Sequence, residues 1–175
     1  MDPMNLPFNR EGAVSELEIA LVRTVVIGRQ EWTVANLNLA WPGSWAPNGD
    51  ETLVEKYGRL YTYDMAVEIA SKVMDWRLPT REDVETMIST VGGSTNGAAA
   101  LKPGGATGFD ALYAGFREPD DDSFRRTGKQ TGFWTGTAAH DEEAWKFWIR
   151  VEDDNIMLRP VSRQYGDSIR LVRER

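Results

Sequence analysis

The chain has 175 residues, 41% of them hydrophobic, and seven tryptophans, which indicates a folded domain of the common size of about 100 to 200 residues. It contains no cysteine, which excludes disulfide bonds, thiolate metal sites and thiol catalysis. A net charge of −7, with basic residues interspersed among acidic ones, argues against a nucleic-acid partner. No apolar run reaches the roughly 20 residues of a membrane span, so we expect no membrane insertion.

The first residues are predicted to form a flexible N-terminal arm. Residues 1–14 include Pro3 and Pro7, and chain ends without packing partners are commonly loosely ordered. They lack the basic segment followed by an apolar segment that marks a secretory signal. We therefore expect a cytoplasmic or virion-associated protein, with a signal segment removed from this sequence as the alternative, and residues 15–175 are expected to form a single domain.

The next part of the chain predicts a β-hairpin and a packed loop. β-Branched residues favour a strand over residues 20–27, Gly28 begins a turn, and residues 30–35 form the second arm. A Pro/Gly-rich loop over residues 40–50 contains Trp41 and Trp45. Since tryptophans in such a loop usually bury area, we expect this loop to pack back on the body of the domain.

Two helices are predicted in the middle of the chain. The first covers residues 64–73 and is expected to be capped by Asp64. The second begins after Thr80, with Asp83 at the capping-box position, and ends at Gly92-Gly93. Its apolar stripe consists of Val84, Met87, Ile88 and Val91. Residues 92–108, rich in Gly and Ala, are expected to form a compact loop.

The remaining chain is predicted to be rich in strands. Residues 109–117 suggest a strand broken at Gly115, an acidic turn follows over residues 118–123, and an arm leads through residues 124–130 toward Phe133 and Trp134. A β-rich start, two helices and a β-rich end predict an α+β fold, in which the helices pack on antiparallel sheets and hairpins.

Residues 145–151 alternate between apolar and polar side chains, as in a strand with one buried face. Trp145, Phe147, Ile149 and Val151 are expected to face inward, with Lys146, Trp148 and Arg150 outward. After an acidic turn the alternation resumes, with Ile156 and Leu158 inward and Met157 and Arg159 outward, which predicts a hairpin. Residues 168–173 form the last predicted strand. Because Trp148 stands between two cations, its face is predicted to be a recognition surface.

Aromatic and basic residues outside this strand also carry expectations. The core is expected to contain Trp32, Trp76, Phe109, Phe133, Trp134 and Trp145. Arginines crowd the C-terminal region, and we interpret them as solvated strand ends, with a polyanion site as the alternative. These arginines are Arg159, Arg163, Arg170, Arg173 and Arg175.

Six short sequence motifs occur in the order seen in a known family. They are IGRQEWTVANL (27–37), YGRLY (57–61), WRLPTREDV (76–84), GFDALYAGFR (108–117), FWTGT (133–137) and SIRLVR (168–173). In this order they resemble the Fibrobacter succinogenes major paralogous domain, over about residues 26–173. That family is similar to the formylglycine-generating-enzyme branch of the C-type lectin fold, so the resemblance implies a C-type lectin-like fold.

The chain also resembles the variable proteins of diversity-generating retroelements, whose C-terminal region is hypermutated on a fixed scaffold. This resemblance implies a ligand-binding, variable region over about residues 133–173. The implied ligand is macromolecular, with protein favoured over glycan. The implied ligand-binding residues are Ala139, His140, Asp141, Lys146, Trp148, Arg150, Asp153, Asp154, Arg159, Ser162, Arg163 and Gln164.

The sequence supports an enzymatic function less well than it supports ligand binding. A formylglycine-generating enzyme uses its own cysteines, which this chain lacks, so we expect no enzyme and no catalytic residue. The single histidine, His140, lies in a predicted loop and is expected to be a contact residue instead of a metal ligand. Acidic runs could supply oxygen ligands, so calcium stays open, although no Asp-x-Asp-x-Asp-Gly loop is present and no cofactor is expected. A metal-dependent enzyme-like protein and a purely structural surface module are the alternatives.

Overall fold

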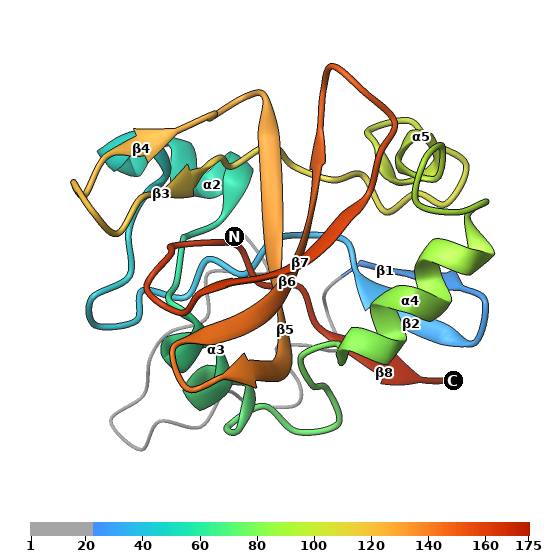
Figure 1. Cartoon of the computed structure of the whole chain (residues 1–175), viewed down its shortest axis with the longest axis horizontal. Coiled ribbons are helices and arrows are strands. Elements are labelled where there is room, and N and C mark those ends of the chain that lie inside the picture. Colours follow the sequence, from blue (N-terminus) through green and yellow to red (C-terminus); the bar gives the residue numbers. More distant parts are fainter. Residues whose placement is uncertain (1–22) are drawn as a thin grey trace.

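The structure is a computed structural model, and it describes residues 23–175 (Figure 1). Within these residues the chain combines helices with three small antiparallel sheets, which confirms the α+β prediction. The predicted arm at residues 1–14 lies outside the described residues. None of the described helices has the length and apolar character needed to cross a membrane.

The first sheet joins the two ends of the described chain. It consists of β1 (Thr24–Ile27), β2 (Gln30–Thr33) and β8 (Val172–Glu174), in the order β1-β2-β8. Gly28 has a φ of 64°, a conformation that glycine adopts without strain, and it lies in the turn that connects β1 to β2. The predicted hairpin is confirmed, although β2 ends two residues earlier than expected and residues 20–22 lie outside the described residues.

The central sheet contains the longest strands and crosses the middle of the molecule (Figure 1). Its strands are β5 (Gln130–His140), β6 (Glu143–Arg150) and β7 (Met157–Ser162), in the order β5-β6-β7. Phe147 pairs with Leu158 across β6 and β7, which confirms the predicted hairpin. The last predicted strand is shorter than expected, because regular pairing begins only at Val172.

Two helices flank the central sheet. Helix α3 (Tyr63–Ala70) is capped by Thr62, whose side chain accepts a hydrogen bond from the Met65 amide. The predicted cap at Asp64 is therefore wrong, and Asp64 lies in the first turn, where a carboxylate favours the helix dipole. Helix α4 (Arg81–Thr90) begins as predicted, with the Thr80 and Asp83 capping box present in both directions.

Shorter elements complete the fold. These are the 3-10 helices η1 (Pro47–Gly49) and η2 (Glu51–Leu53) and the single-turn helices α2 (Val54–Tyr57) and α5 (Ala98–Leu101). Helix α5 lies inside the glycine-rich segment and buries Ala98 and Leu101, so the predicted compact loop is confirmed. The loop over residues 40–50 packs back as expected: Trp41 contacts the core, and the Arg117 guanidinium lies 4.2 Å from the Trp45 ring centre.

The strand predicted over residues 109–117 is mostly wrong. Only β3 (Phe116–Arg117) forms, paired with β4 (Phe124–Arg125). The backbone at Asp110 has a positive φ of 48°, and the carbonyl groups of Phe109 and Asp110 accept hydrogen bonds from the Arg170 side chain. These carbonyl groups therefore bond to a side chain instead of a neighbouring strand.

Two hydrophobic clusters hold the elements together. The first lies around α3 and includes Tyr63 and Trp134, whose rings meet edge to face with centres 5.7 Å apart. The second lies around α4 and includes Phe133 and Phe147, with ring centres 5.0 Å apart. The aromatic residues predicted for the core are buried except Trp145, which is half-buried beneath the Arg81 guanidinium.

Candidate functional site

Strand β6 presents two different faces, as its sequence predicts. Phe147 and Ile149 are buried in the second hydrophobic cluster. Trp148 and Arg150 are half-buried on the opposite face, while Val151, expected to face inward, follows the strand and is 50% exposed. We call the second face the Trp148 face. By alternation and register it carries Gln130 and Gly132 of β5, Lys146, Trp148 and Arg150 of β6, and Met157, Arg159 and Val161 of β7.

The main departure from the sequence prediction is Lys146, which is only 4% exposed. Its Nζ lies 2.7 Å from Oδ2 of Asp167, a residue with no exposed surface in the segment after β7. Burial raises the pKa of Asp167, and the nearby Lys146 ammonium opposes that shift. Lys146 therefore lies on the outward face by alternation, but it is covered by the segment after β7. It can be buried there because it neutralises the buried Asp167 carboxylate.

Three aromatic rings surround the Lys146 ammonium. Nζ lies 4.7 Å from the ring centre of Tyr165, 5.4 Å from that of Phe116 and 5.6 Å from that of Trp148. Aromatic faces carry partial negative charge, so these distances are attractive for the ammonium. Phe116 comes from β3 and Tyr165 from the segment after β7, so the fold gathers this cluster from distant parts of the sequence.

A pocket of about 320 Å³ opens at this cluster, and we call it the Trp148 pocket. Burial raises the pKa of the Tyr165 hydroxyl, and the adjacent Glu118 carboxylate, to which Tyr165 is hydrogen-bonded, raises it further. The pocket thus joins apolar ring surface to a few polar groups, as small-molecule and side-chain sites do. Its lining residues are Phe116, Glu118, Gln130, Lys146, Trp148, Val161 and Tyr165.

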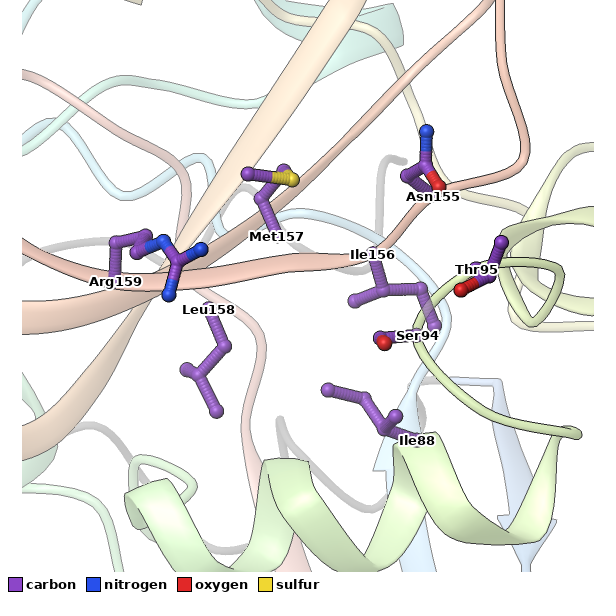
Figure 2. A pocket seen from close by; sticks show the side chains of 8 residues that line it. All are labelled: Ile88, Ser94, Thr95, Asn155, Ile156, Met157, Leu158 and Arg159. Atoms are coloured by element: carbon purple, nitrogen blue, oxygen red, sulfur yellow. The ribbon is translucent and has the colours of Figure 1, made fainter.

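Arg159 lies at a second hollow, of about 300 Å³, between β7 and α4 (Figure 2). Ile156 and Leu158 point toward α4 there, where Ile88 lies, while Met157 points away from it. Ile156 is buried and Arg159 is exposed, as predicted, but Leu158 is only half-buried. The hollow is lined by Ile88, Ser94, Thr95, Asn155, Ile156, Met157, Leu158 and Arg159.

Other predicted site residues are held by neighbours in the turn after β6. Arg150 Nη2 lies 2.9 Å from Oδ2 of Asp153, and Oδ1 of Asp154 lies 2.9 Å from Nζ of Lys102. The backbone carbonyl groups of Val151 and Asp153 also accept from Lys102. These contacts shape the turn, so its charged residues have structural partners in addition to their predicted contact role.

The rest of the predicted residues lie at the opposite end of the sheet. His140 is exposed and ends β5 opposite Glu143, so its predicted placement in a loop is wrong. Arg163 Nη1 lies 3.9 Å from Oδ1 of Asp64, with its guanidinium 4.9 Å from the Tyr63 ring centre. The members of this end group are Ala139, His140, Asp141, Ser162, Arg163 and Gln164. The candidate residues therefore fall in separate places, and the Trp148 pocket brings together Lys146 and Trp148.

Possible metal ligands do not cluster in the described part of the chain. Among residues 23–175, no group of three or more His, Asp or Glu side chains is arranged to hold a metal ion. Acidic residues in the runs that suggested calcium form ion pairs: Asp121 with Arg125, and Glu152 with Arg126.

The Fibrobacter succinogenes major domain model matches residues 25–173 of the chain. The chain belongs to this family. The match covers the central sheet, the Trp148 pocket and the buried Lys146–Asp167 pair. No curated protein and no solved structure matches the chain.

For this member of the Fibrobacter succinogenes major domain family, sequence reasoning missed part of the site. Phe116, Glu118, Tyr165 and Asp167 were not among the predicted residues. One signal was present: Asp167 directly precedes the predicted strand over residues 168–173, and an acidic residue needs a cation when it is buried. That cation is Lys146, which lies among the alternating residues of β6.

Gly132 has a specific role beneath the pocket, which leads to a testable prediction. A Cβ atom at this position would lie 2.3 Å from Oδ1 of Asp167. Gly132→Ala should therefore displace Asp167 and lower the free energy of unfolding by about 1–3 kcal/mol, as overpacking does, measured by urea denaturation. Gly136→Ala on the same strand is the control, because its nearest contact would be 3.3 Å from Leu78. Equal effects of the two substitutions would contradict this role.

Proposed function

We propose that this family member is a ligand-binding protein whose binding surface is the Trp148 face, with the Trp148 pocket at its centre. The observation that carries the proposal is the convergence of Lys146 and Trp148 with Phe116 and Tyr165 around one hollow. A half-buried tryptophan beside charged groups is the kind of anchor that dominates binding energy at interfaces. Binding here needs neither a metal ion nor a nucleophile, and we propose a non-enzymatic role.

We infer further that the domain has a C-type lectin-like fold of the formylglycine-generating-enzyme type. We also infer that residues 133–173 are diversified, as in the variable proteins of diversity-generating retroelements. The two faces of β6 support the inferred diversification. Phe147 and Ile149 pack in the core and fix the position of the strand, while a substitution of Trp148 would leave no cavity in the core. Lys146 should change least on its face, because a substitution would leave Asp167 buried without a cation.

The proposed ligand is macromolecular, with protein favoured over glycan. Indole and arginine side chains such as Trp148 and Arg159 are enriched at protein-binding hot spots. Surrounding charges such as Glu118 would set orientation and exclude wrong partners more than they would add affinity.

A pair of tryptophan variants tests the proposal. Immobilised protein would be used to capture partners from an extract of the natural community that carries the gene, and the binding constant of the captured partner would be measured. Trp148→Ala should weaken binding by about 2 kcal/mol or more. Trp145→Ala is the matched control, since it removes the same side chain from the opposite face of β6. Equal binding by Trp148→Ala and the unaltered protein would contradict the proposal.

A further inference from the structure

We propose that the Trp148 pocket binds a single phenol ring, presented as a tyrosine side chain by a protein partner. This inference rests on the proposed function and names the chemistry that the same site recognises. It follows from the size of the pocket, from the cation that already occupies its aromatic cluster and from the hydrogen-bonding groups that remain there.

The size and walls of the pocket suit one ring. Its volume of about 320 Å³ is at the lower end of ligand pockets, which span about 300–1,000 Å³. Val161, Phe116 and Trp148 supply apolar surface from three different strands. Burying an aromatic side chain among such groups is favourable, and a single planar ring needs little ordering on binding.

The aromatic cluster already contains a cation, which argues against a cationic ligand. The Lys146 ammonium lies within 5.6 Å of three ring centres, the arrangement that would otherwise attract a ligand ammonium group. A second cation would meet like-charge repulsion from Lys146 without gaining those ring contacts. A lysine, arginine or quaternary ammonium ligand is therefore disfavoured.

A ligand anion is disfavoured as well. Asp167 neutralises Lys146 at 2.7 Å, and the Glu118 carboxylate also lines the pocket. A carboxylate or phosphate would therefore gain little from Lys146, whose charge Asp167 already neutralises, and it would be repelled by the Glu118 carboxylate, which also pairs with Arg125 at 3.6 Å. The pocket favours a neutral ligand.

The polar groups fit a hydroxyl that both accepts and donates. An ammonium has three donor hydrogens, and within the described residues Asp167 is the acceptor hydrogen-bonded to Lys146 Nζ. Lys146 therefore has donor capacity for a ligand oxygen. Glu118 already accepts from Tyr165, but a carboxylate has about four acceptor positions and can accept a second hydroxyl. A phenol oxygen can accept from Lys146 and donate to Glu118.

A sugar ring is the competing ligand for aromatic surface with polar neighbours. Sugars carry several hydroxyl groups, each of which needs a partner when buried. Besides Lys146 and Glu118, the polar side chains that line the pocket are Gln130 and Tyr165, and Tyr165 already donates to Glu118. A phenol, with one hydroxyl and an apolar ring, matches this inventory better.

The test compares two soluble probes that differ by one hydroxyl. N-acetyl-tyrosinamide and N-acetyl-phenylalaninamide would be titrated into isotope-labelled protein while backbone and Lys146 ammonium signals are followed by NMR. We expect saturable shifts of the pocket residues, with the tyrosine probe binding at least about tenfold more tightly, since a hydrogen bond to a charged group contributes that much. The Lys146 ammonium signal should move with the tyrosine probe. Trp148→Ala should abolish these shifts and Trp145→Ala should preserve them.

Three results would overturn the proposal: equal affinity for the two probes, no saturation with either, or tighter binding of methyl glucoside than of the tyrosine probe. These results are distinguishable from failure of the proposed function. If Trp148→Ala still weakens binding of a macromolecular partner while the probes fail, the binding surface stands and only the phenol assignment is wrong. If Trp148→Ala leaves capture unchanged, the proposed function itself fails.

Discussion

Lys146→Met is expected to lower the free energy of unfolding by about 3–5 kcal/mol, because removal of one partner leaves the other charge buried and unpaired. Asp167 has no exposed surface, and its Oδ1 makes no hydrogen bond within the described residues, so Lys146 is its essential partner. Urea denaturation of both proteins measures the difference. Arg150→Met is the matched control on the same face of β6, where the ion pair with Asp153 is partly exposed and should contribute less than about 1 kcal/mol.

A double variant separates the lost charge from lost packing. Adding Asp167→Ala to Lys146→Met removes the unpaired carboxylate and should recover part of the lost stability. If Lys146→Met destabilises the protein no more than Arg150→Met does, the buried pair does not have the role assigned to it here.

The same pair predicts how stability depends on pH. Burial raises the pKa of Asp167 above its ordinary value of 3.8, despite the opposing effect of Lys146. The folded protein then binds the carboxyl proton of Asp167 more tightly than the unfolded chain does. The stability that this difference contributes is fully present below pH 3.8, and it is lost as pH rises through the pKa of Asp167 in the folded protein. Without Lys146 the folded pKa rises further. The difference in free energy of unfolding between the unaltered protein and Lys146→Met should therefore be largest above the pKa of Asp167 in the variant. This difference should become smaller as pH is lowered.

Arg170→Met is the second substitution with a large expected effect. Arg170 is 1% exposed, donates to Oδ1 of Asn36 at 2.9 Å and donates to the carbonyl oxygens of Phe109 and Asp110. Burial lowers the pKa of its guanidinium to about 9, so it remains charged at neutral pH. Each buried acceptor left unsatisfied costs about 1–3 kcal/mol, so we expect a total loss of roughly 3 kcal/mol or more by urea denaturation.

The geometry of the Arg170 side chain should matter as much as its charge. Its guanidinium also lies 4.2 Å from the Phe109 ring centre, and a lysine cannot reproduce this planar fork. Arg170→Lys should therefore recover little of the lost stability. Arg173→Met is the control, because its side chain is 41% exposed and its pair with Glu31 is only partly buried. Full recovery with lysine would show that a positive charge alone suffices.

Local patterns in the sequence predicted the elements that depend on neighbouring residues. The capping box at Thr80 and the alternation around Phe147 need only a few adjacent positions, and both are confirmed. The identity of what covers each face could not be predicted in this way. Lys146 is buried because Asp167 packs over it from outside the strand, and alternation carries no information about that contact.

The arginines near the C-terminus show the same limit. They were expected to be solvated, and Arg175 and Arg159 are exposed. Arg170 is fully buried because it satisfies the carbonyl groups of residues about 60 positions earlier, the same contact that prevents a strand at Phe109. Composition and spacing cannot reveal such long-range pairing. Of the residues that line the Trp148 pocket, only Lys146 and Trp148 were predicted for this reason, since Phe116 and Tyr165 reach it through tertiary folding.

Sequencing the 3′ end of the gene deeply across the natural population that carries it tests the central claim most directly. We predict that substitutions concentrate on exposed and half-buried positions such as Trp148 and Arg159, while Phe147 and Ile149 stay unchanged. Lys146 should stay unchanged or change together with Asp167, because the two charges are buried as a pair. A segment that is evenly invariant over residues 133–173, or substitutions spread equally over core and surface, would contradict a diversified binding surface.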